Sequence, residues 1–382
     1  MKTVGIICEY NPFHLGHQKQ FDKIRATLGP DTVIVCLMSG NFVQRGKPAI
    51  FDKALRARAA IDCGADLVLE LPVTCALSSA EGFAAGGVTI LSPFCDYLCF
   101  GCETGDADSL MSTALTLLSQ AFGPALQQEL ESGCSFPVAR QRALKQLGGN
   151  NSLLENPNDI LAVEYCKAIL AQDSPMKPLP IRREGNYHDT QADAENPSAT
   201  AIRKLMEQDD NWFSYVPAPA QKVFQNAPIH TLAAGERAVL ARLRTMTDGD
   251  FEALPYGSEG LWRKLMHACR ECATLEDILI ATKSKRYTRT RLDRMVMCAY
   301  LGITEEILNM YVPYVRVLGL RTSGIPVLKQ ARETGLFPHI GEKIDHPYQA
   351  LERRWDDLYG LFCSDAPASA GIDHDRRIYL LK

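Results

Sequence analysis

The chain has 382 residues, of which 46% are hydrophobic and 23% charged, and its formal net charge is −4. This composition excludes disordered, collagen-like and fibrous proteins, and at roughly 150 residues per domain the length predicts two domains. The slightly acidic balance excludes a protein that coats nucleic acid over its whole surface, but it leaves room for a local basic patch.

Apolar runs rich in Val, Ile and Leu alternate with helical patterns through the first 215 residues. Strands are expected at residues 3–8, 32–38, 66–71, 97–100 and 179–182. Helices are expected from 17, over 52–63, from 79, between 106 and 147, over 159–171 and from 200. Such alternation is typical of a parallel sheet covered on both faces. We therefore expect a doubly wound, Rossmann-like α/β domain over residues 1–215.

The pattern changes after Pro217 and Pro219. Helical periodicity with few strand-like runs is found at residues 233–246, 258–274, 275–282 and 289–301. A second, mainly helical domain is therefore expected over residues 216–382. Its last part is expected to be packed, because it carries Trp355, Tyr359, Phe362 and Tyr379.

Neither a membrane span nor an export signal is expected. The uncharged stretch 109–128 is about half polar, and Glu9 interrupts the short apolar run at the start. Thirteen scattered cysteines, an odd number, favour reduced thiols over a disulfide framework. We therefore expect a cytoplasmic protein.

The segment between the first expected strand and the first expected helix carries His14, Gly16 and His17 in the pattern His-x-Gly-His. In an open α/β sheet, ligands bind at the carboxyl ends of strands, where helix N-termini offer backbone N–H groups and a positive dipole. Gly16 would let the backbone approach a phosphate closely. Two nearby histidines alone usually have no such role, but this placement favours an anion site.

A second motif, Ser-x-Thr-x-x-Arg, places Ser198 and Thr200 at a helix start and Arg203 on its first turns. A hydroxyl there can be a plain N-cap. Together with His-x-Gly-His, however, the motif resembles the nucleotidyltransferase superfamily, in which both helix starts converge on the triphosphate of ATP. The resemblance implies catalytic roles for His14, His17 and Arg203.

A narrower resemblance, to the tRNA(Met) cytidine acetate ligases, runs from Gly5 at least to Gly319. It is carried by residues 9–17, 39–46, 100–103, 157–161, 183 with 187–189, and 285–288. Leu15 and Cys102 depart from the pattern, since the family often has Asn and Ser there. Neither change removes a phosphate-binding group, so they bear on fine specificity more than on chemistry.

By resemblance, ATP is bound by the loop 7–20 and by residues that match Gly101, Asn158 and Arg183. Gly101, which follows a strand, would leave room for the adenosine because it has no side chain. Asn158 would cap the helix that starts at 159. Arg183 would form two parallel hydrogen bonds to a phosphate. The alternatives without a ligand are a simple turn at Gly101, a simple helix cap at Asn158 and a surface ion pair at Arg183. The other expected contacts are Ile7, Cys8, Glu9, Tyr10, Asn11, Pro12, Phe13, His14, Leu15, Gly16, His17, Gln18, Lys19, Gln20, Ser198 and Thr200.

The family's activity implies an ATP-dependent ligase that makes N4-acetylcytidine at the wobble position of elongator tRNA(Met). Acetate attacks the α-phosphorus of ATP, pyrophosphate leaves, and the acetyl group passes from acetyl-adenylate to cytidine with release of AMP. Magnesium is expected to neutralise the pyrophosphate. No catalytic triad and no nucleophilic cysteine is required.

Residues 283–294 contain six basic side chains and one acid. Tyr287 among them is suited to stack on a base, so this segment is expected to hold RNA. A solvated helix face is the alternative. The side chains expected to clamp phosphates are Lys283, Lys285, Arg286, Arg289 and Arg291.

A second polar group follows the second expected strand, on the ligand side of the sheet. Contacts to acetate or tRNA are expected there, with surface ion pairs as the alternative. The residues are Asn41, Gln44, Arg45, Lys53 and Arg56.

Two kinds of metal site compete with this interpretation. Cys95, Cys99 and Cys102 have the spacing of a radical SAM iron–sulfur site, but strand alternation sends Cys99 into the core. Cys269 and Cys272 resemble half a zinc site, yet no suitable second ligand pair follows them. Helical packing explains this pair better.

Two other functions remain open. One is a small-molecule adenylyltransferase, although such chains usually have a single domain. The other is a noncatalytic RNA-binding protein that keeps a nucleotide site. Acetate-dependent exchange between ATP and pyrophosphate would rule out the second.

Overall fold

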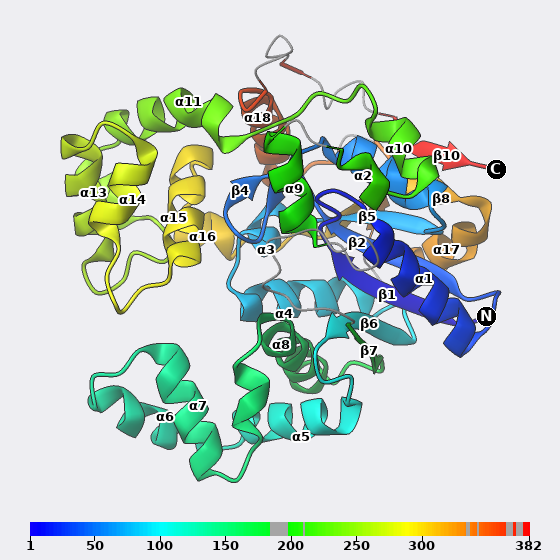
Figure 1. Cartoon of the computed structure of the whole chain (residues 1–382), viewed down its shortest axis with the longest axis horizontal. Helices are drawn as coiled ribbons and strands as arrows, with labels where there is room; N and C mark the ends of the chain where they lie inside the picture. The colour runs from blue at the N-terminus through cyan, green and yellow to red at the C-terminus, as the bar shows by residue number, and fades with distance from the viewer. Residues whose placement is uncertain (184–197, 209–210, 334–336, 342–343, 364–369, 372–376) are drawn as a thin grey trace.

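The structure is a computed structural model that describes residues 1–382 except 184–197, 209–210, 334–336, 342–343, 364–369 and 372–376. Tyr187, His188 and Asp189 of the family resemblance lie outside the described residues. Figure 1 shows a central sheet with helices on both sides, a group of helices from the later part of the chain on the left, and α5 to α7 below.

Five parallel strands in the order β5-β2-β1-β6-β7 form the centre of the sheet. They are β1 (Thr3–Cys8), β2 (Val33–Ser39), β5 (Leu67–Leu71), β6 (Tyr97–Cys102) and β7 (Lys177–Arg182). The expected doubly wound α/β fold is confirmed. The order reverses at β1, which pairs with β2 on one side and β6 on the other, and such a reversal opens a crevice beyond the carboxyl ends of the strands.

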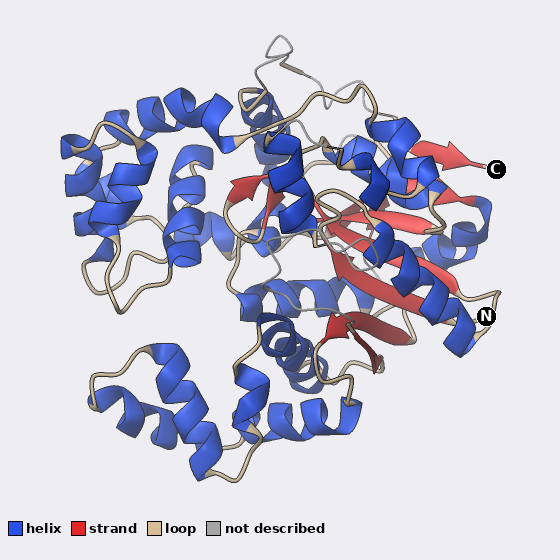
Figure 2. Ribbon diagram, viewed as in Figure 1, coloured by secondary structure: helices blue, strands red, loops and turns tan. Residues whose placement is uncertain are grey.

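Alternation along the strands fills two cores, one on each face of the sheet. Figure 2 shows the helices that cover the sheet. Val4 and Ile6 of β1 pack on the face covered by α1 (Leu15–Leu28), α2 (Lys53–Asp62), α9 (Ala199–Glu207) and α10 (Ala218–Phe224). Ile7 packs on the other face, which is covered by α3 (Val73–Ala76), α4 (Ala80–Leu91), α5 (Ala107–Leu118), α8 (Pro157–Ala171) and α17 (Ile325–Glu333).

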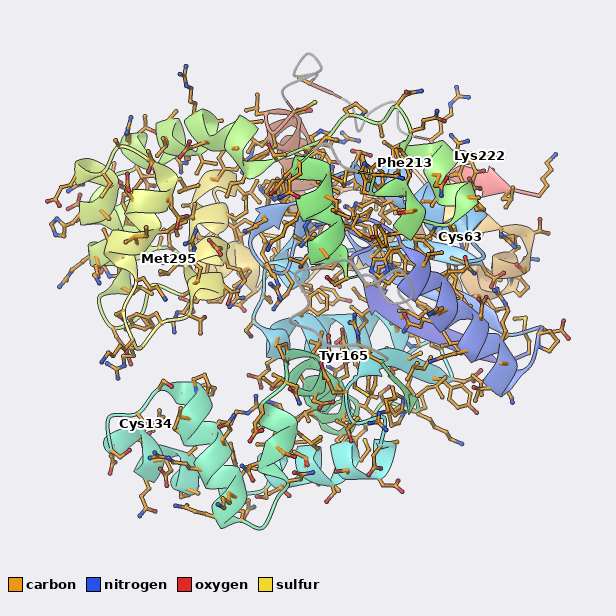
Figure 3. The ribbon with its side chains drawn as sticks, viewed as in Figure 1. Cys63, Cys134, Tyr165, Phe213, Lys222 and Met295 are labelled. Carbon is orange, nitrogen blue, oxygen red and sulfur yellow. The ribbon has the colours of Figure 1, made fainter. Side chains whose placement is uncertain are left out.

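Two groups of helices extend from this body. The first is α6 (Phe122–Glu131) and α7 (Phe136–Gln146), with Cys134 between them (Figure 3). The second packs around a core that includes Met295 (Figure 3). It comprises α11 (Leu232–Thr245), α12 (Asp248–Glu252), α13 (Leu261–Glu271), α14 (Leu275–Thr282), α15 (Arg289–Leu301) and α16 (Glu305–Leu308).

The last part of the chain differs from the mainly helical segment that was expected. β8 (Tyr314–Arg321) pairs antiparallel with β5, and β9 (Phe337–His339) and β10 (Tyr379–Leu381) pair with β8. These strands extend the sheet and cover an edge of β5 that would otherwise be open. Helix α18 (Pro347–Gly360) carries Trp355 and Tyr359 into the interior, as expected.

No helix in the described part of the chain has the length and apolar character needed to cross a bilayer.

Candidate active site

A cavity of about 420 Å³ lies at the carboxyl ends of β1, β6 and β7 and at the starts of α1, α8 and α9. Its size is within the range of small-molecule sites. Most of the residues expected to bind ATP line it. They are Ile7, Cys8, Glu9, Tyr10, Asn11, His14, Gly16, His17, Lys19, Gln20, Gly101, Asn158 and Arg183, and Arg203, which was expected to be catalytic, lines it too.

Six expected contacts are not in the described lining, and their role in ATP binding stays a prediction. Phe13 is fully buried beneath the loop. The Ser198 hydroxyl accepts from the Ala201 N–H at 3.1 Å, which makes it the N-cap of α9. The full set is Pro12, Phe13, Leu15, Gln18, Ser198 and Thr200.

The loop between β1 and α1 is held firmly by its own side chains. Tyr10 has a φ of 45°, and its ring lies 4.9 Å from that of Phe13 and 4.8 Å from that of His17, centroid to centroid. The Asn11 Oδ1 accepts from the Ile50 N–H at 2.7 Å. A residue with positive φ persists only where the surroundings fix it, which these packed rings and hydrogen bonds do.

His14 and His17 form a stacked pair, with ring centroids 3.7 Å apart and 27° between the planes. The His14 Nδ1 accepts from the Gly16 N–H at 3.1 Å, and the His17 Nδ1 accepts from the His14 N–H at 3.2 Å. A neutral imidazole whose Nδ1 accepts carries its proton on Nε2. The helix start therefore fixes the tautomer of both rings, so that each Nε2–H is a donor.

Burial keeps both histidines neutral. It lowers the pKa of His14 to about 3, helped by the positive charges of Arg183 and Arg203. It lowers the pKa of His17 well below the ordinary value, with further lowering by His14 and Arg183. The pair is therefore a set of neutral donors beside cations.

Arg203 crosses from α9 to the loop after β1. Its Nη1 donates to the Asn11 carbonyl at 2.6 Å, and its Nη2 donates to the Thr200 hydroxyl at 3.2 Å. Arg183 follows β7 directly and donates to the Asn158 Oδ1 at 3.4 Å. Two guanidinium groups and two imidazole donors around one cavity suit a polyphosphate.

Asn158 does not cap its helix, because α8 begins at Pro157 with Asn156 in the cap position. Its Nδ2 instead donates to the Glu103 Oε1 at 2.7 Å. The other Glu103 oxygen accepts from the Asp159 N–H at 2.8 Å. Glu103 lay within the family motif, but only the structure shows that it orients Asn158 between itself and Arg183.

Gly101 lies inside β6 and not after it. A Cβ at this position would come within 3.3 Å of the Arg183 Cγ and 3.4 Å of its Cδ. These separations are tighter than most side-chain contacts, so the missing side chain leaves room for Arg183 beside the cavity.

Three residues expected to contact acetate or tRNA are in fact structural. Asn41, Lys53 and Arg56 are 1%, 1% and 0% exposed. The Lys53 ammonium lies 2.8 Å from the Glu70 carboxylate and 2.7 Å from that of Asp356. The expectation was wrong for these three residues because their polar groups are used inside the protein. Gln44 and Arg45 of the same group do line the cavity.

Arg56 holds the start of the loop between β1 and α1 in place through hydrogen bonds to backbone carbonyls. Its guanidinium donates to the carbonyls of Glu9 at 2.6 Å, Ser39 at 3.1 Å and Phe51 at 2.8 Å, and also to that of Gly40. It thereby ties the ends of β1 and β2 together. We classify it as a positioning residue.

We expect Asn41→Ala to lower the free energy of unfolding by about 2 kcal/mol, because it leaves buried partners unsatisfied. The Asn41 amide accepts from the Lys53 N–H at 2.8 Å and donates to the Asp356 carboxylate at 2.9 Å. Urea unfolding measures the change. Asn226→Ala, at an exposed position, is the matched control, and equal stability of the two variants would contradict the prediction.

The basic segment, defined as residues 283–294, is only partly open to solvent. Lys283, Lys285 and Arg286 are exposed. Arg289 is committed to ion pairs with Glu276 at 2.6 Å and Asp293 at 3.0 Å. Arg291 donates to the Tyr256 carbonyl at 2.7 Å. Arg289 and Arg291 therefore have structural contacts in addition to any contact with RNA.

A second cavity, of about 660 Å³, adjoins the basic segment. Arg286, Tyr287 and Arg291 line one side of it, and Phe136 at the start of α7 lines another. Ser79 lines this cavity, and the next residue, Ala80, lines the first one. Consecutive residues at the start of α4 therefore line the two cavities.

The cysteines of the alternative metal sites are packed in the interior. Cys95, Cys99 and Cys102 are buried, and burial raises the pKa of Cys99 to about 12 and that of Cys102 to about 11. Thiols that resist ionisation are poor ligands for a cluster. Cys269 is also buried, and its pKa is raised to about 12 for the same reason.

Comparison with known proteins agrees with this geometry. Residues 1–370 match the sequence pattern of the HIGH Nucleotidyl Transferase family. The chain belongs to this family. The expected resemblance to tRNA(Met) cytidine acetate ligases is also confirmed. The protein of that name from Acetivibrio thermocellus is 35% identical over 100% of both chains, and the one from Thermosipho melanesiensis is 36% identical over 91% of this chain and 85% of the other.

Two crystal structures of Thermotoga maritima TmcAL match the whole of this chain over the whole of theirs, each with 30% identity. The apo form gives a TM-score of 0.90, and the form bound with alpha-thio ATP gives 0.89. A protein of the same fold and family therefore binds an ATP analogue.

Proposed function

We propose that this protein is an ATP-dependent ligase that acetylates the N4 amine of the wobble cytidine in elongator tRNA(Met), with acetate as the acyl donor. One observation carries the proposal: the stacked His14 and His17 present two neutral Nε2–H donors beside Arg183 and Arg203, in a cavity at the switch point of the sheet. The relatives named above, which are enzymes, supply the substrate class.

In the first step, an acetate oxygen attacks the α-phosphorus of ATP and pyrophosphate leaves. Negative charge builds on the phosphate oxygens in the transition state. The histidine donors and Arg203 are placed to stabilise that charge without forming a covalent bond. Gly101, Asn158 and Arg183 lie on the β6 and β7 side of the cavity, which we assign to the nucleotide.

Magnesium fits this site as an ion carried by the triphosphate. Mg²⁺ at nucleotide sites takes phosphate oxygens, water and one or two carboxylates. The part of the chain that the structure describes contains no cluster of three or more possible metal ligands, so the ion would be held mainly by phosphate oxygens and water. The positive charge of the magnesium ion would offset the negative charge of the departing pyrophosphate.

In the second step, the cytidine amine attacks the carbonyl of acetyl-adenylate and AMP leaves. The tRNA is proposed to lie along the basic segment and the cavity beside it. The protein would act in the cytoplasm, where thiols stay reduced, and its thirteen unpaired cysteines agree with that location.

The proposal is tested by incubating the protein with ATP, acetate and total tRNA and analysing the nucleosides by mass spectrometry. We expect N4-acetylcytidine that depends on both ATP and acetate. A small-molecule adenylyltransferase, the other candidate, would leave the tRNA unmodified and would not require acetate for pyrophosphate release.

Arg183→Ala is expected to weaken ATP binding by about tenfold or more, since a hydrogen bond to a charged group contributes roughly 1.5 kcal/mol and 1.4 kcal/mol is tenfold. Calorimetric titration with ATP measures the loss. Arg58→Ala, at an exposed position on α2, should bind as the wild type does. Equal affinity of both variants would remove Arg183 from the site.

A further inference from the structure

Glu9 stands apart in the cavity as the only carboxylate in the lining that the structure describes. It is the first residue after β1, and its side chain is partly exposed. Its Oε1 accepts from the Gln44 N–H at 2.7 Å. Its carbonyl is held by Arg56 at 2.6 Å. The side-chain carboxylate and the backbone carbonyl of Glu9 are therefore both held in place.

The second step of the proposed reaction needs a proton acceptor, and the other candidate groups in the lining are unsuited. His14 and His17 use Nδ1 as an acceptor and carry hydrogen on Nε2, and burial lowers both pKa values. Burial raises the pKa of Tyr10 and Tyr165, so these hydroxyls stay protonated. Tyr165 is a buried residue of α8 (Figure 3).

Glu9 also lies on the side from which RNA would arrive. Residues 42–48 form a hairpin of β3 (Phe42–Val43) and β4 (Lys47–Pro48). Gln44 in this hairpin holds the Glu9 carboxylate, and a Cβ on Gly46 would touch the backbone of Arg294 in the basic segment. The hairpin therefore joins the carboxylate directly to the segment proposed to bind tRNA.

We assign the nucleotide to the side of the cavity with Gly101, Asn158 and Arg183. Ser79 and Ala80, at the start of α4, line the second and the first cavity respectively. Gln44 reaches the same place, with its Nε2 3.5 Å from the Ser78 carbonyl. A nucleotide held beside the basic segment would thus enter at the Gln44 side. Its amine would meet the acetyl-adenylate close to Glu9.

We propose that Glu9 is the general base of acetyl transfer, an inference that rests on the proposed function. The N4 lone pair forms a bond to the acetyl carbon, and an N4 proton passes to the Glu9 carboxylate. The bond between the acetyl carbon and the phosphate oxygen then breaks, and its electron pair leaves with AMP. Glu9 returns the proton to solvent.

The test is Glu9→Gln, whose amide oxygen can still accept from Gln44. Enzyme-bound acetyl-adenylate is formed first, and transfer to a tRNA(Met) transcript is then followed in a single turnover. A general base contributes about 10²-fold or more, so transfer should slow by at least that factor. Acetate-dependent exchange between ATP and pyrophosphate should slow by a much smaller factor.

Rescue by a shorter carboxylate separates a base from a structural group. Glu9→Gln keeps the hydrogen bond from Gln44 but has no carboxylate, so it should stay slow, whereas Glu9→Asp should recover part of the rate of transfer. Glu81→Gln, on the exposed first turn of α4, is the matched control and should behave as the wild type.

Three outcomes would overturn the proposal: transfer by Glu9→Gln at the wild-type rate, no recovery of transfer in Glu9→Asp, or loss of exchange as large as the loss of transfer. A higher magnesium requirement for exchange would accompany the third outcome if Glu9 were a metal ligand. A wild-type protein that neither exchanges nor acetylates would instead refute the proposed function, so the two failures are distinct.

Discussion

His14→Ala and His17→Ala should each reduce acetate-dependent pyrophosphate release by about a hundredfold or more. Each removes one Nε2–H donor from the site, and loss of one donor to a developing oxyanion costs roughly 3 kcal/mol. Because the two rings stack at 3.7 Å and share the helix cap, we expect the double variant to lose less than the product of the single effects.

Pyrophosphate release is measured by a coupled assay with ATP and acetate at saturation. His267→Ala provides the control, because His267 is exposed on α13 and lies far along the chain from the cavity. Thermal unfolding checks that each variant folds. Turnover near the wild-type level in both His14→Ala and His17→Ala would refute the assignment of this cavity to acetate activation.

Four strands of the parallel sheet, β1, β2, β5 and β6, could be predicted because nearly all of their residues are apolar and buried, whereas β7 is only partly buried. The expected ends of β1 agree with the observed ends, and those of β2, β5, β6 and β7 lie within two residues of the observed ends. In those four strands, burial on both faces removes the polar alternation that makes edge strands ambiguous. The His-x-Gly-His loop could be placed for the same reason, since it directly follows one of these strands.

β8 was missed although Tyr314–Arg321 is rich in β-branched and large apolar residues. It follows a long helical region, and its partner β5 lies more than 240 residues earlier in the chain. Pairing at that separation leaves no local signal. The strand was therefore read as part of the helical segment.

Asn41, Lys53 and Arg56 were misread for a related reason. Polar residues after a strand usually face the ligand, and nothing near them in the sequence shows that they are covered. Asn41 and Lys53 share Asp356 as a partner, and α18 brings this residue in from 315 positions beyond Asn41. The tautomers of His14 and His17 likewise depended on hydrogen-bond geometry, and composition carries no information about it.

The largest effect on RNA binding is expected from replacing Lys283, Lys285 and Arg286 together by Gln. These three are the exposed members of the expected clamp, so the change should leave the packing of α15 intact. Taking the duplex-DNA value of about 0.9 per phosphate contact, the slope of log affinity against log salt should fall by nearly three units. At 0.15 M salt this corresponds to roughly a hundredfold weaker binding.

Filter binding of tRNA(Met) across a salt series measures the slope, and exchange between ATP and pyrophosphate without tRNA reports the first step separately. Replacing Lys222, Lys329 and Lys382 by Gln is the charge-matched control, because α10, α17 and β10 lie on the side of the molecule away from α13 to α15 (Figure 1). If both triple variants gave the wild-type slope, the basic segment would be a solvated surface. The tRNA would then have to be held by the remaining cations at the mouth of the cavity, of which Arg45 lies beside the Gln44 entrance and would be the first to replace.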